Sequence, residues 1–333
     1  MTAPACPKTM THGPCGGVAA DGGCEVAPGP CVFLDRPTVR WSGADGPAPR
    51  TTVHPLLALM RQRPVVVADL PAAPLSRESL ERSVDVLAGT VDAVLLGDSG
   101  GARVQFPPAH RVALVQARGV PAWAGLTCRD RNRVALEGEL AALADVGAAA
   151  VHCVTGDHTA LGDRPDAQPV FDLDSTELAA RAAAAGLLVS VAEAPAGPPV
   201  QRRPHRLAEK VRAGAQVGVV NHCGGPEVVA EFVAAAVAAG ADVPFVVCVA
   251  VALDAASAAE LRRFPGLVLP DRYLDAVETA RDPARAGISA AVSLAEALLS
   301  IPGVRGVDLS AVSPPGRELT TAGALATIGR ALS

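Results

Sequence analysis

The chain has 333 residues, of which half are hydrophobic and 3% aromatic, and its formal net charge at pH 7 is −5. This length suits a single barrel-sized α/β domain with a large aliphatic core, and the acidic balance argues against an electrostatic nucleic-acid-binding protein. The longest apolar run, residues 243–253, is too short to cross a bilayer, and the N-terminus lacks the apolar stretch of a signal peptide. The sequence therefore predicts a cytoplasmic protein that does not use a membrane.

Residues 1–55 have no helical or strand period and are rich in turn-forming residues. Four cysteines lie close together in this stretch: Cys6, Cys15, Cys24 and Cys31. Without an export signal, disulfides are not expected in a reducing cytosol, so we expect these thiols to bind a metal. They suit a closed tetrahedral zinc site, and a four-iron, four-sulfur cluster also needs four cysteines. The metal would supply the folding energy that so few apolar side chains cannot.

From residue 64 onward, short β-branched runs alternate with Ala-rich amphipathic segments. The runs predicted as strands are residues 64–70, 92–98, 121–128, 148–156, 186–194, 215–222, 243–251 and 304–311.

Several of the segments between these runs carry helix-start and helix-stop signals. Ser76 is the expected N-cap of the first helix, Ser175 or Asp174 caps a later one, and Gly186 ends it. The predicted helices are residues 76–89, 130–147, 174–186, 225–240, 287–303 and 318–332.

Eight β-then-α units predict a (β/α)8 TIM barrel over residues 56–333, preceded by a small Cys-rich metal-binding module and linker over residues 1–55. A doubly wound open sheet is the alternative. It is weakened because the first strand is followed by VADLPAAPL, which contains no G-x-G-x-x-G motif.

Barrel enzymes place their chemistry where strands end and βα loops begin. That rule selects polar residues at predicted strand ends: Asp69, Asp98, Thr127, Asp157, Glu193, Asn221 and His222. The long loop over residues 155–175 follows the fourth strand and contains Gly156-Asp157-His158, which either belongs to a site or only caps the next element. Arg129, Arg131 and Arg133 either bind a phosphate or carboxylate or form a solvated helical turn.

Separated motifs in this chain resemble the methylenetetrahydrofolate reductase family. They are VVADLPAAPLSRESL, VDAVLLGDSGGARV, LTCRDRNR, CVTGDHTALGD, LAEKVRAGAQ and DPARAGISAAVSLAEALLSIPGVRGVDLS, in the order of the family. The likeness spans roughly residues 60–332. The opening CPKTMTHGPCGG resembles the cysteine-rich module of the small partner subunit of acetogen-type reductases.

This resemblance implies a TIM barrel in which NAD(P)H reduces FAD, and the flavin passes hydride to 5,10-methylenetetrahydrofolate to give 5-methyltetrahydrofolate. It implies that Asp157 tunes cofactor and folate and that Lys210 contacts the phosphate region of the cofactor. Thr127 would lie near the flavin, and Gly156 and His158 would shape the binding loop.

The chain departs from the family pattern at several site positions. Asp69 stands where the family has its acidic glutamate, so it is the predicted catalytic acid beside Asp157, and Asn221 stands in place of a folate-binding glutamine. Gly125, Ala194 and Arg203 replace residues that the family uses near the flavin. The resemblance therefore leaves two routes open, hydride transfer through bound FAD and direct transfer from the nicotinamide.

Two other functions remain open at this stage. The barrel could act on another one-carbon or iminium substrate, or it could be a non-catalytic folate-binding or partner subunit. A homo-oligomer or a complex with a partner reductase subunit is also expected from the resemblance of the cysteine-rich module.

Overall fold

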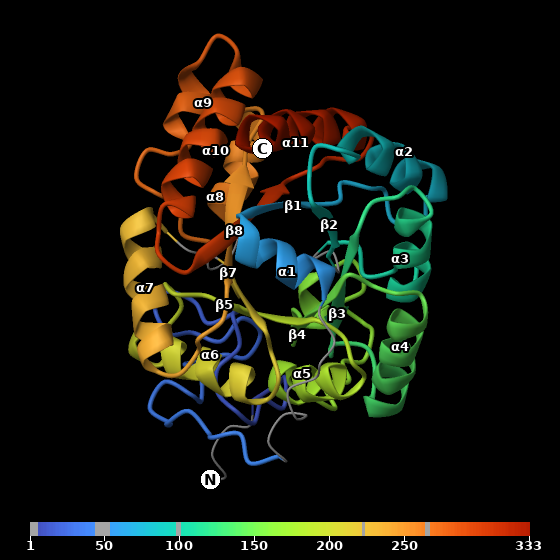
Figure 1. Cartoon of the computed structure of the whole chain (residues 1–333). Helices are drawn as coiled ribbons and strands as arrows, with labels where there is room; N and C mark the ends of the chain where they lie inside the picture. The colour runs from blue at the N-terminus through green and yellow to red at the C-terminus, as the bar shows by residue number, and fades with distance from the viewer. Residues whose placement is uncertain (1–5, 44–53, 98–100, 222–223, 264–266) are drawn as a thin grey trace.

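The computed structural model describes residues 6–43, 54–97, 101–221, 224–263 and 267–333. Its eight strands close into a barrel in sequence order, and every neighbouring pair is parallel. The helices surround the strands (Figure 1). The predicted TIM barrel is confirmed, and the open-sheet alternative is wrong because the first strand pairs with the last.

All eight predicted strands are present, with the predicted bounds up to three residues too long at either end. They are β1 (Val65–Asp69), β2 (Ala93–Leu96), β3 (Ala122–Thr127), β4 (Ala150–Val154), β5 (Val189–Glu193), β6 (Val217–Val220), β7 (Phe245–Val251) and β8 (Val304–Ala311). Asp98 and His222, which the strand-end rule selected, lie outside the described residues.

The six predicted helices are confirmed as α2 (Arg77–Leu87), α4 (Arg133–Asp145), α5 (Ser175–Ala184), α7 (Pro226–Ala238), α10 (Pro283–Leu299) and α11 (Glu318–Leu332). The structure adds five helices that the pattern did not indicate: α1 (Pro55–Gln62), α3 (Pro108–Gln116), α6 (Arg203–Arg212), α8 (Ala255–Arg263) and α9 (Asp275–Thr279). These added helices have ten residues or fewer, so each offers few turns over which a helical period can be seen.

Side-chain caps fix the start of four confirmed helices, α2, α4, α5 and α10. Ser76 accepts a hydrogen bond from the backbone N–H of Ser79 and begins α2. Asp174 forms a complete capping box with Glu177 at the start of α5, which selects Asp174 over Ser175 as the cap.

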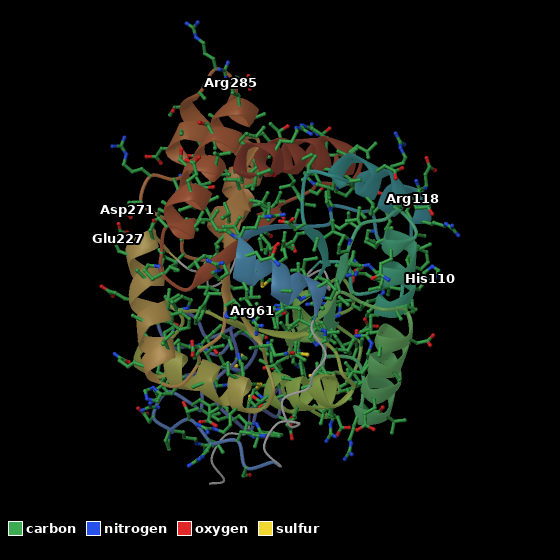
Figure 2. All side chains as sticks on the ribbon, in the orientation of Figure 1. Arg61, His110, Arg118, Glu227, Asp271 and Arg285 are labelled. Atoms are coloured by element: carbon green, nitrogen blue, oxygen red, sulfur yellow. The ribbon has the colours of Figure 1, made fainter. Side chains whose placement is uncertain are left out.

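Two apolar layers hold the barrel together. One lies between the strands and the outer helices, and the other fills the barrel interior near the N-terminal ends of the strands. Helix α1 closes that end with Leu56 and Met60 (Figure 1), and Arg305 on β8 donates hydrogen bonds to the carbonyls of Met60 and Arg61. Charged side chains such as Arg118 and Arg285 point outward from the helical ring (Figure 2). Within the described ranges, no helix is long and apolar enough to cross a membrane.

Residues 6–43, called the N-terminal segment below, contain turns and two isolated antiparallel bridges, Val18↔Cys24 and Gly23↔Pro30. The segment packs against the loop after β4, where Lys8 bonds to Gly156, and against α6, where the backbone N–H of Trp41 bonds to Glu209. Arg202, in the loop after β5, donates to the carbonyl of Leu34. The segment therefore lies at the C-terminal ends of the strands, opposite α1, where a TIM barrel carries its chemistry.

Candidate functional site

Asp69 is the carboxyl group at the C-terminal end of β1. Its Oδ2 atom accepts a hydrogen bond of 2.5 Å from the hydroxyl of Ser310 on β8. A Cβ atom at Gly97 would lie 4.0 Å from Oδ1 of Asp69, which is an ordinary van der Waals contact. Burial raises the pKa of Asp69 to about 6, against the lowering effects of Ser310 and Arg111. Asp69 can therefore exchange a proton near neutral pH, as an acid in this position would require.

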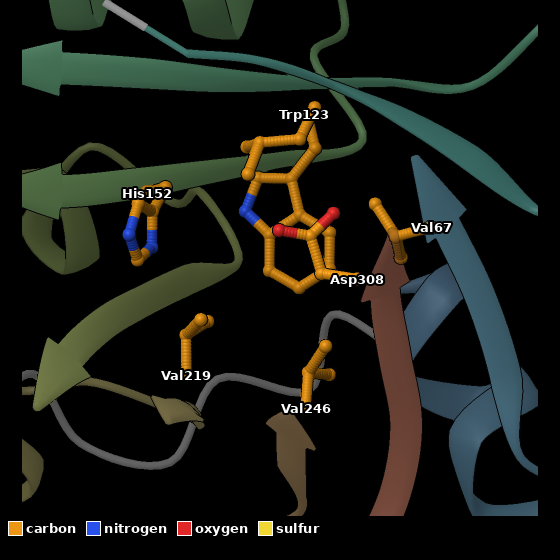
Figure 3. Close-up of a pocket in the computed structure, with 7 residues that line it drawn as sticks. Val67, Trp123, His152, Val219, Val246 and Asp308 are labelled. Carbon is orange, nitrogen blue, oxygen red and sulfur yellow. The ribbon is translucent and has the colours of Figure 1, made fainter. Parts of the chain in front are cut away.

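Polar side chains also line the barrel interior beneath the strand ends. Ser190 on β5 accepts a hydrogen bond of 3.0 Å from the indole N–H of Trp123, and its hydroxyl lies 2.8 Å from Nδ1 of His152. Burial, helped by the charge of Lys210, lowers the pKa of His152 to about 4, so this imidazole is neutral. Trp123, His152 and Asp308 on β8 border one small cavity (Figure 3).

The sequence prediction missed His152, Ser190 and Asp308. Each lies within a strand rather than at its end, so the strand-end rule passes over it. The alternation of side chains along a strand was the available signal, because a polar residue in register with inward-facing apolar residues must point into the barrel. Asp308, for example, pairs in register with the inward-facing Val67.

The loop after β4 brings two predicted residues together. Gly156 has a backbone φ of +87°, and a Cβ atom there would lie 2.9 Å from Cβ of Thr127. Only glycine fits both the backbone conformation and the contact. Thr127 itself is buried at the end of β3. The structure therefore places the loop directly against the end of the neighbouring strand.

Two residues of the N-terminal segment hold this loop. Lys8 donates a hydrogen bond of 2.8 Å to the carbonyl of Gly156, and Glu25 accepts one of 3.2 Å from the backbone N–H of His158. Lys8 and Glu25 also form a buried ion pair. Asp157 is exposed, and although burial acts to lower the pKa of Lys8, the negative charges of Cys15, Glu25 and Asp157 raise it. A cation from the N-terminal segment thus lies beside the predicted catalytic aspartate.

A buried ionic cluster occupies the end of β5. Glu193 forms ion pairs of 2.9 Å with both Lys210 and Arg203, and all three side chains are almost fully buried. Lys210 also donates to the carbonyl of Ala192. Burial acts to raise the pKa of Glu193, but the two cations hold it below its ordinary value. Arg203 extends the cluster by donating a hydrogen bond of 3.0 Å to the carbonyl of Cys15.

A second buried cluster attaches the N-terminal segment to the barrel. The ring of His12 lies 3.1 Å from Oδ2 of Asp174, and Arg206 lies 3.7 Å from the same oxygen. All three side chains are at least nine-tenths buried. Although burial acts to raise the pKa of Asp174, the hydrogen bond from His12 and the charge of Arg206 hold it well below its usual range.

The four N-terminal cysteines are free thiols. Burial raises the pKa of Cys31, and the neighbouring Cys6 and Cys24 raise it further, so these sulfur atoms lie within reach of each other's charge. Cys6 acts on Cys15 in the same way. Among the described residues, however, no three His, Cys, Asp or Glu side chains are grouped so that they could hold a metal ion. The donor set suits zinc chemically, and zinc binding stays a prediction.

The three arginines after β3 contact acidic residues of their own chain. Arg129 is buried and lies 3.2 Å from Asp130, which also pairs with Arg131. Arg133 pairs with Glu137 one turn along α4. This geometry favours the structural interpretation over a phosphate site.

Three of the groups that the resemblance assigns to the cofactor, Gly156, His158 and Lys210, are already bonded within the chain. The Gly156 carbonyl and the His158 N–H already bond to Lys8 and Glu25. Lys210 is paired with Glu193 and is 6% exposed, so its ammonium does not face an open site. These three groups therefore do not fit a bound flavin in this structure.

Asn221 follows β6, and its Oδ1 atom is buried with no hydrogen-bond partner among the described residues. Its backbone N–H donates to the carbonyl of Glu193. Asp69, Thr127, Asn221 and the Gly156 loop all follow strand ends and so share the C-terminal face of the barrel. An unpaired amide oxygen at that face is suited to accept a hydrogen bond from a ligand.

Comparison with known proteins agrees with this fold. A family described as methylenetetrahydrofolate reductase matches residues 84–313. No curated protein matches the chain. One similar solved structure is an uncharacterized protein from Clostridium thermocellum that binds two copies of 5-methyl-5,6,7,8-tetrahydrofolic acid. It is 13% identical with a TM-score of 0.63, and the alignment covers 84% of this chain and 99% of that chain. Another, 2,3-dimethylmalate lyase of the PEP mutase/isocitrate lyase superfamily, is 14% identical with a TM-score of 0.45, covering 76% and 77%.

Proposed function

Because the chain belongs to the methylenetetrahydrofolate reductase family, we propose that it reduces 5,10-methylenetetrahydrofolate to 5-methyltetrahydrofolate with hydride taken from NAD(P)H. The observation that carries this proposal is Asp69, a half-buried carboxyl group at the barrel mouth whose pKa is raised to about 6. Reduction of the methylene bridge requires an acid that protonates N10 and opens the five-membered ring to an iminium ion. Asp69 has the position and the proton affinity for that step.

Direct transfer from the nicotinamide is the version that the site supports. Gly156, His158 and Lys210, three of the groups predicted to hold FAD, are bonded within the chain. A hydride transfer between two substrates on one barrel face balances without a resident flavin. Hydride leaves the nicotinamide and adds to the methylene carbon, and the proton supplied at N10 completes the product. The protein then contributes binding, orientation and the proton.

Folate binding is proposed at the face that carries Asp69. The Clostridium thermocellum structure has the same fold and contains a methylated tetrahydrofolate, which supports a folate ligand for this chain. The buried Oδ1 atom of Asn221 would accept a hydrogen bond from the pterin. Asp157, exposed beside Lys8, would orient the rest of the substrate, while Thr127 and Gly156 shape the loop that carries it.

Zinc is proposed for the thiols of Cys6, Cys15, Cys24 and Cys31, with an iron–sulfur cluster as the alternative. Its role would be structural. The N-terminal segment contains few buried apolar residues, among them Met10, Val18 and Phe33, and bound metal would add the folding energy that this small apolar set does not supply.

The test is steady-state oxidation of NADH or NADPH with 5,10-methylenetetrahydrofolate and no added flavin, with 5-methyltetrahydrofolate identified as the product. Asp69→Asn, which keeps the size of the side chain but removes its proton, should lower kcat by about 10²–10⁴-fold. The exposed variant Asp271→Asn is the matched control. Turnover that appears only when FAD is added would overturn direct transfer, and full activity of Asp69→Asn would overturn the role of Asp69.

A non-catalytic folate-binding protein is the second candidate. It is favoured by the contacts of Lys8 and Glu25, which occupy the loop that the family uses for its cofactor. Calorimetric titration with 5-methyltetrahydrofolate separates the two: binding without NAD(P)H oxidation supports this candidate, and turnover excludes it. Turnover with a different iminium substrate, in the absence of folate turnover, would instead support a diverged one-carbon enzyme.

A further inference from the structure

Two carboxyl groups, the half-buried Asp69 and the buried Asp308, lie on neighbouring strands near the mouth of the barrel. β1 and β8 pair in parallel with Val67 opposite Asp308, and side chains alternate along each strand. Val67 and Asp308 both border the interior cavity (Figure 3). Asp69 therefore points to the same side, one layer nearer the C-terminal end of the strands. Its contact with Ser310, two residues beyond Asp308, confirms this placement.

Asp308 receives fewer hydrogen bonds than a buried carboxylate ion needs to remain charged. It is 2% exposed. Its Oδ2 atom accepts a hydrogen bond of 3.4 Å from the thiol of Cys248 on β7, and its Oδ1 atom has no hydrogen-bond partner among the described residues. A buried ion in such surroundings is costly, whereas a neutral carboxylic acid is tolerated. The geometry alone therefore favours the protonated form of Asp308.

The charges around the pair act unequally on its two members. Arg111 on α3 donates to the carbonyl of Gly97 at the end of β2 and lowers the pKa of Asp69. The titratable side chains facing Asp308 are Cys248, the neutral His152 and Asp69 itself. Burial, followed by the negative charge of Asp69, raises the pKa of Asp308 well above its ordinary value. We therefore expect the pair to titrate in two steps, with Asp69 losing its proton at the lower pH.

We propose that Asp308 holds the proton of this pair at neutral pH and passes it to Asp69 through an intervening water molecule, since no direct hydrogen bond joins these two side chains, so that two carboxyl groups together serve as the acid at the barrel mouth. Asp69 alone would be mostly ionised at neutral pH because its pKa is about 6. Asp308 does not touch the substrate in this proposal. It stores the proton and acts only through Asp69, which makes it a positioning residue rather than a catalytic one. This inference rests on the proposed function for its catalytic consequence, but not for the location of the proton.

The proposed step balances in atoms and charge. The proton moves from Asp308 to Asp69 and then to N10 of 5,10-methylenetetrahydrofolate, and the bond between N10 and the methylene carbon breaks with its electron pair going to N10. Hydride from NAD(P)H adds to that carbon, and the π electrons of the iminium return to N5. The pair is left doubly ionised, which repulsion and burial disfavour, and it regains one proton from solvent.

The location of the proton is tested without substrate. Infrared difference spectra across a pH titration should show the carbonyl-stretching band of a protonated carboxyl group in the native protein at pH 7. Asp308→Asn should remove this band at pH 7. Asp69→Asn should keep it but shift its loss to lower pH, because the neighbouring negative charge is gone. A native protein with no such band at pH 7, or a band that persists in Asp308→Asn, would overturn the proposal.

The kinetic test separates proton storage from structural support. In Asp308→Asn the acid is Asp69 alone, so kcat should fall as pH rises through about 6 and be reduced about 100-fold at pH 8. Near pH 5 it should approach the native value, with KM unchanged. An equal loss of kcat at every pH would contradict the proposal. If the wild-type protein shows no turnover, the proposed function fails while the infrared titration still decides where the proton lies.

Cys248→Ala provides an independent variant if Asp308→Asn does not fold. The thiol of Cys248 lowers the pKa of Asp308, so its removal should move the upper titration of the pair to higher pH, opposite to the effect of Asp308→Asn. A shift in the same direction as Asp308→Asn would contradict the proposal. Asp271→Asn, which makes the same chemical change on an exposed loop, should leave both the spectrum and the pH profile unchanged.

Discussion

Gly156 is the residue on which the geometry of the β4 loop depends most directly. Its φ of +87° and its contact with Thr127 exclude a side chain. Gly156→Ala should lower the free energy of unfolding by about 1–3 kcal/mol and weaken folate binding, because the loop that carries Asp157 must shift. Chemical denaturation and calorimetric folate titration measure the two effects.

Gly119→Ala is the matched control for this variant. Gly119 has a φ of +77°, but a Cβ atom there would meet nothing within 4 Å. The Gly119→Ala variant should lower the free energy of unfolding through backbone strain alone, without a steric clash, and should leave folate binding unchanged. Equal effects of the two variants on binding would mean that the contact between Gly156 and Thr127 does not position the loop.

At single residues, sequence reasoning placed Asp69 and Thr127 correctly at strand ends because the barrel rule depends only on strand order. It could not foresee the partners of Lys210. The ion pair between Lys210 and Glu193 forms because α6 packs against the end of β5. No local sequence pattern predicts that packing contact. The assignments of Asp157 and Asn221 to folate stay predictions until ligand binding is measured.

At the scale of elements, the attachment of the N-terminal segment to α5 and α6 rests on the cluster of His12, Asp174 and Arg206. The pKa of Asp174 is held below its unfolded value, so this group contributes stability above pH 3.8, its ordinary pKa. That contribution is lost as the pH falls below about 4. We expect acid to loosen the segment before it unfolds the barrel, and limited proteolysis across pH would detect the early release.

Asp174→Asn tests the same attachment at neutral pH. Asparagine still caps α5, so the variant isolates the loss of charge beside Arg206. It should lower the free energy of unfolding by about 3–5 kcal/mol, as expected when one partner of a buried ion pair is removed, and should expose residues 6–43 to protease. Asp166→Asn, on an exposed loop, is the control. Native-like protease resistance of Asp174→Asn would show that other contacts suffice.

The elements themselves were largely predictable. Alternating β-branched and Ala-rich segments identified all eight strands and the six longer or well-capped helices, because burial of parallel strands demands such runs. The short helices α1, α3 and α6 carry proline within their first two positions, a signal consistent with a helix start but also with a loop. The packing of the N-terminal segment on the barrel could not be predicted, since its contacts are polar and distant in sequence.

At the scale of the whole molecule, the N-terminal segment packs directly on the C-terminal face of the barrel. If zinc organises the four cysteines, removing it with a chelator should weaken folate binding through Lys8 and Glu25. The barrel should keep its secondary structure, because α1 and the strand–helix core do not include those residues. Metal analysis, far-UV circular dichroism and folate titration, with zinc-saturated chelator as control, measure these outcomes. Unchanged folate binding after metal loss would separate the segment from the site.

The position of the N-terminal segment also affects how the chain is made. His12 and its partner Asp174 are 162 residues apart, so at about 5–20 residues per second the ribosome synthesises Asp174 roughly 8–32 s after His12. During that interval the N-terminal segment has no barrel surface to pack on, and its thiols stay accessible to metal or to chaperones. The segment therefore reaches its native contacts long after it is synthesised, and long-range closure of this kind slows folding.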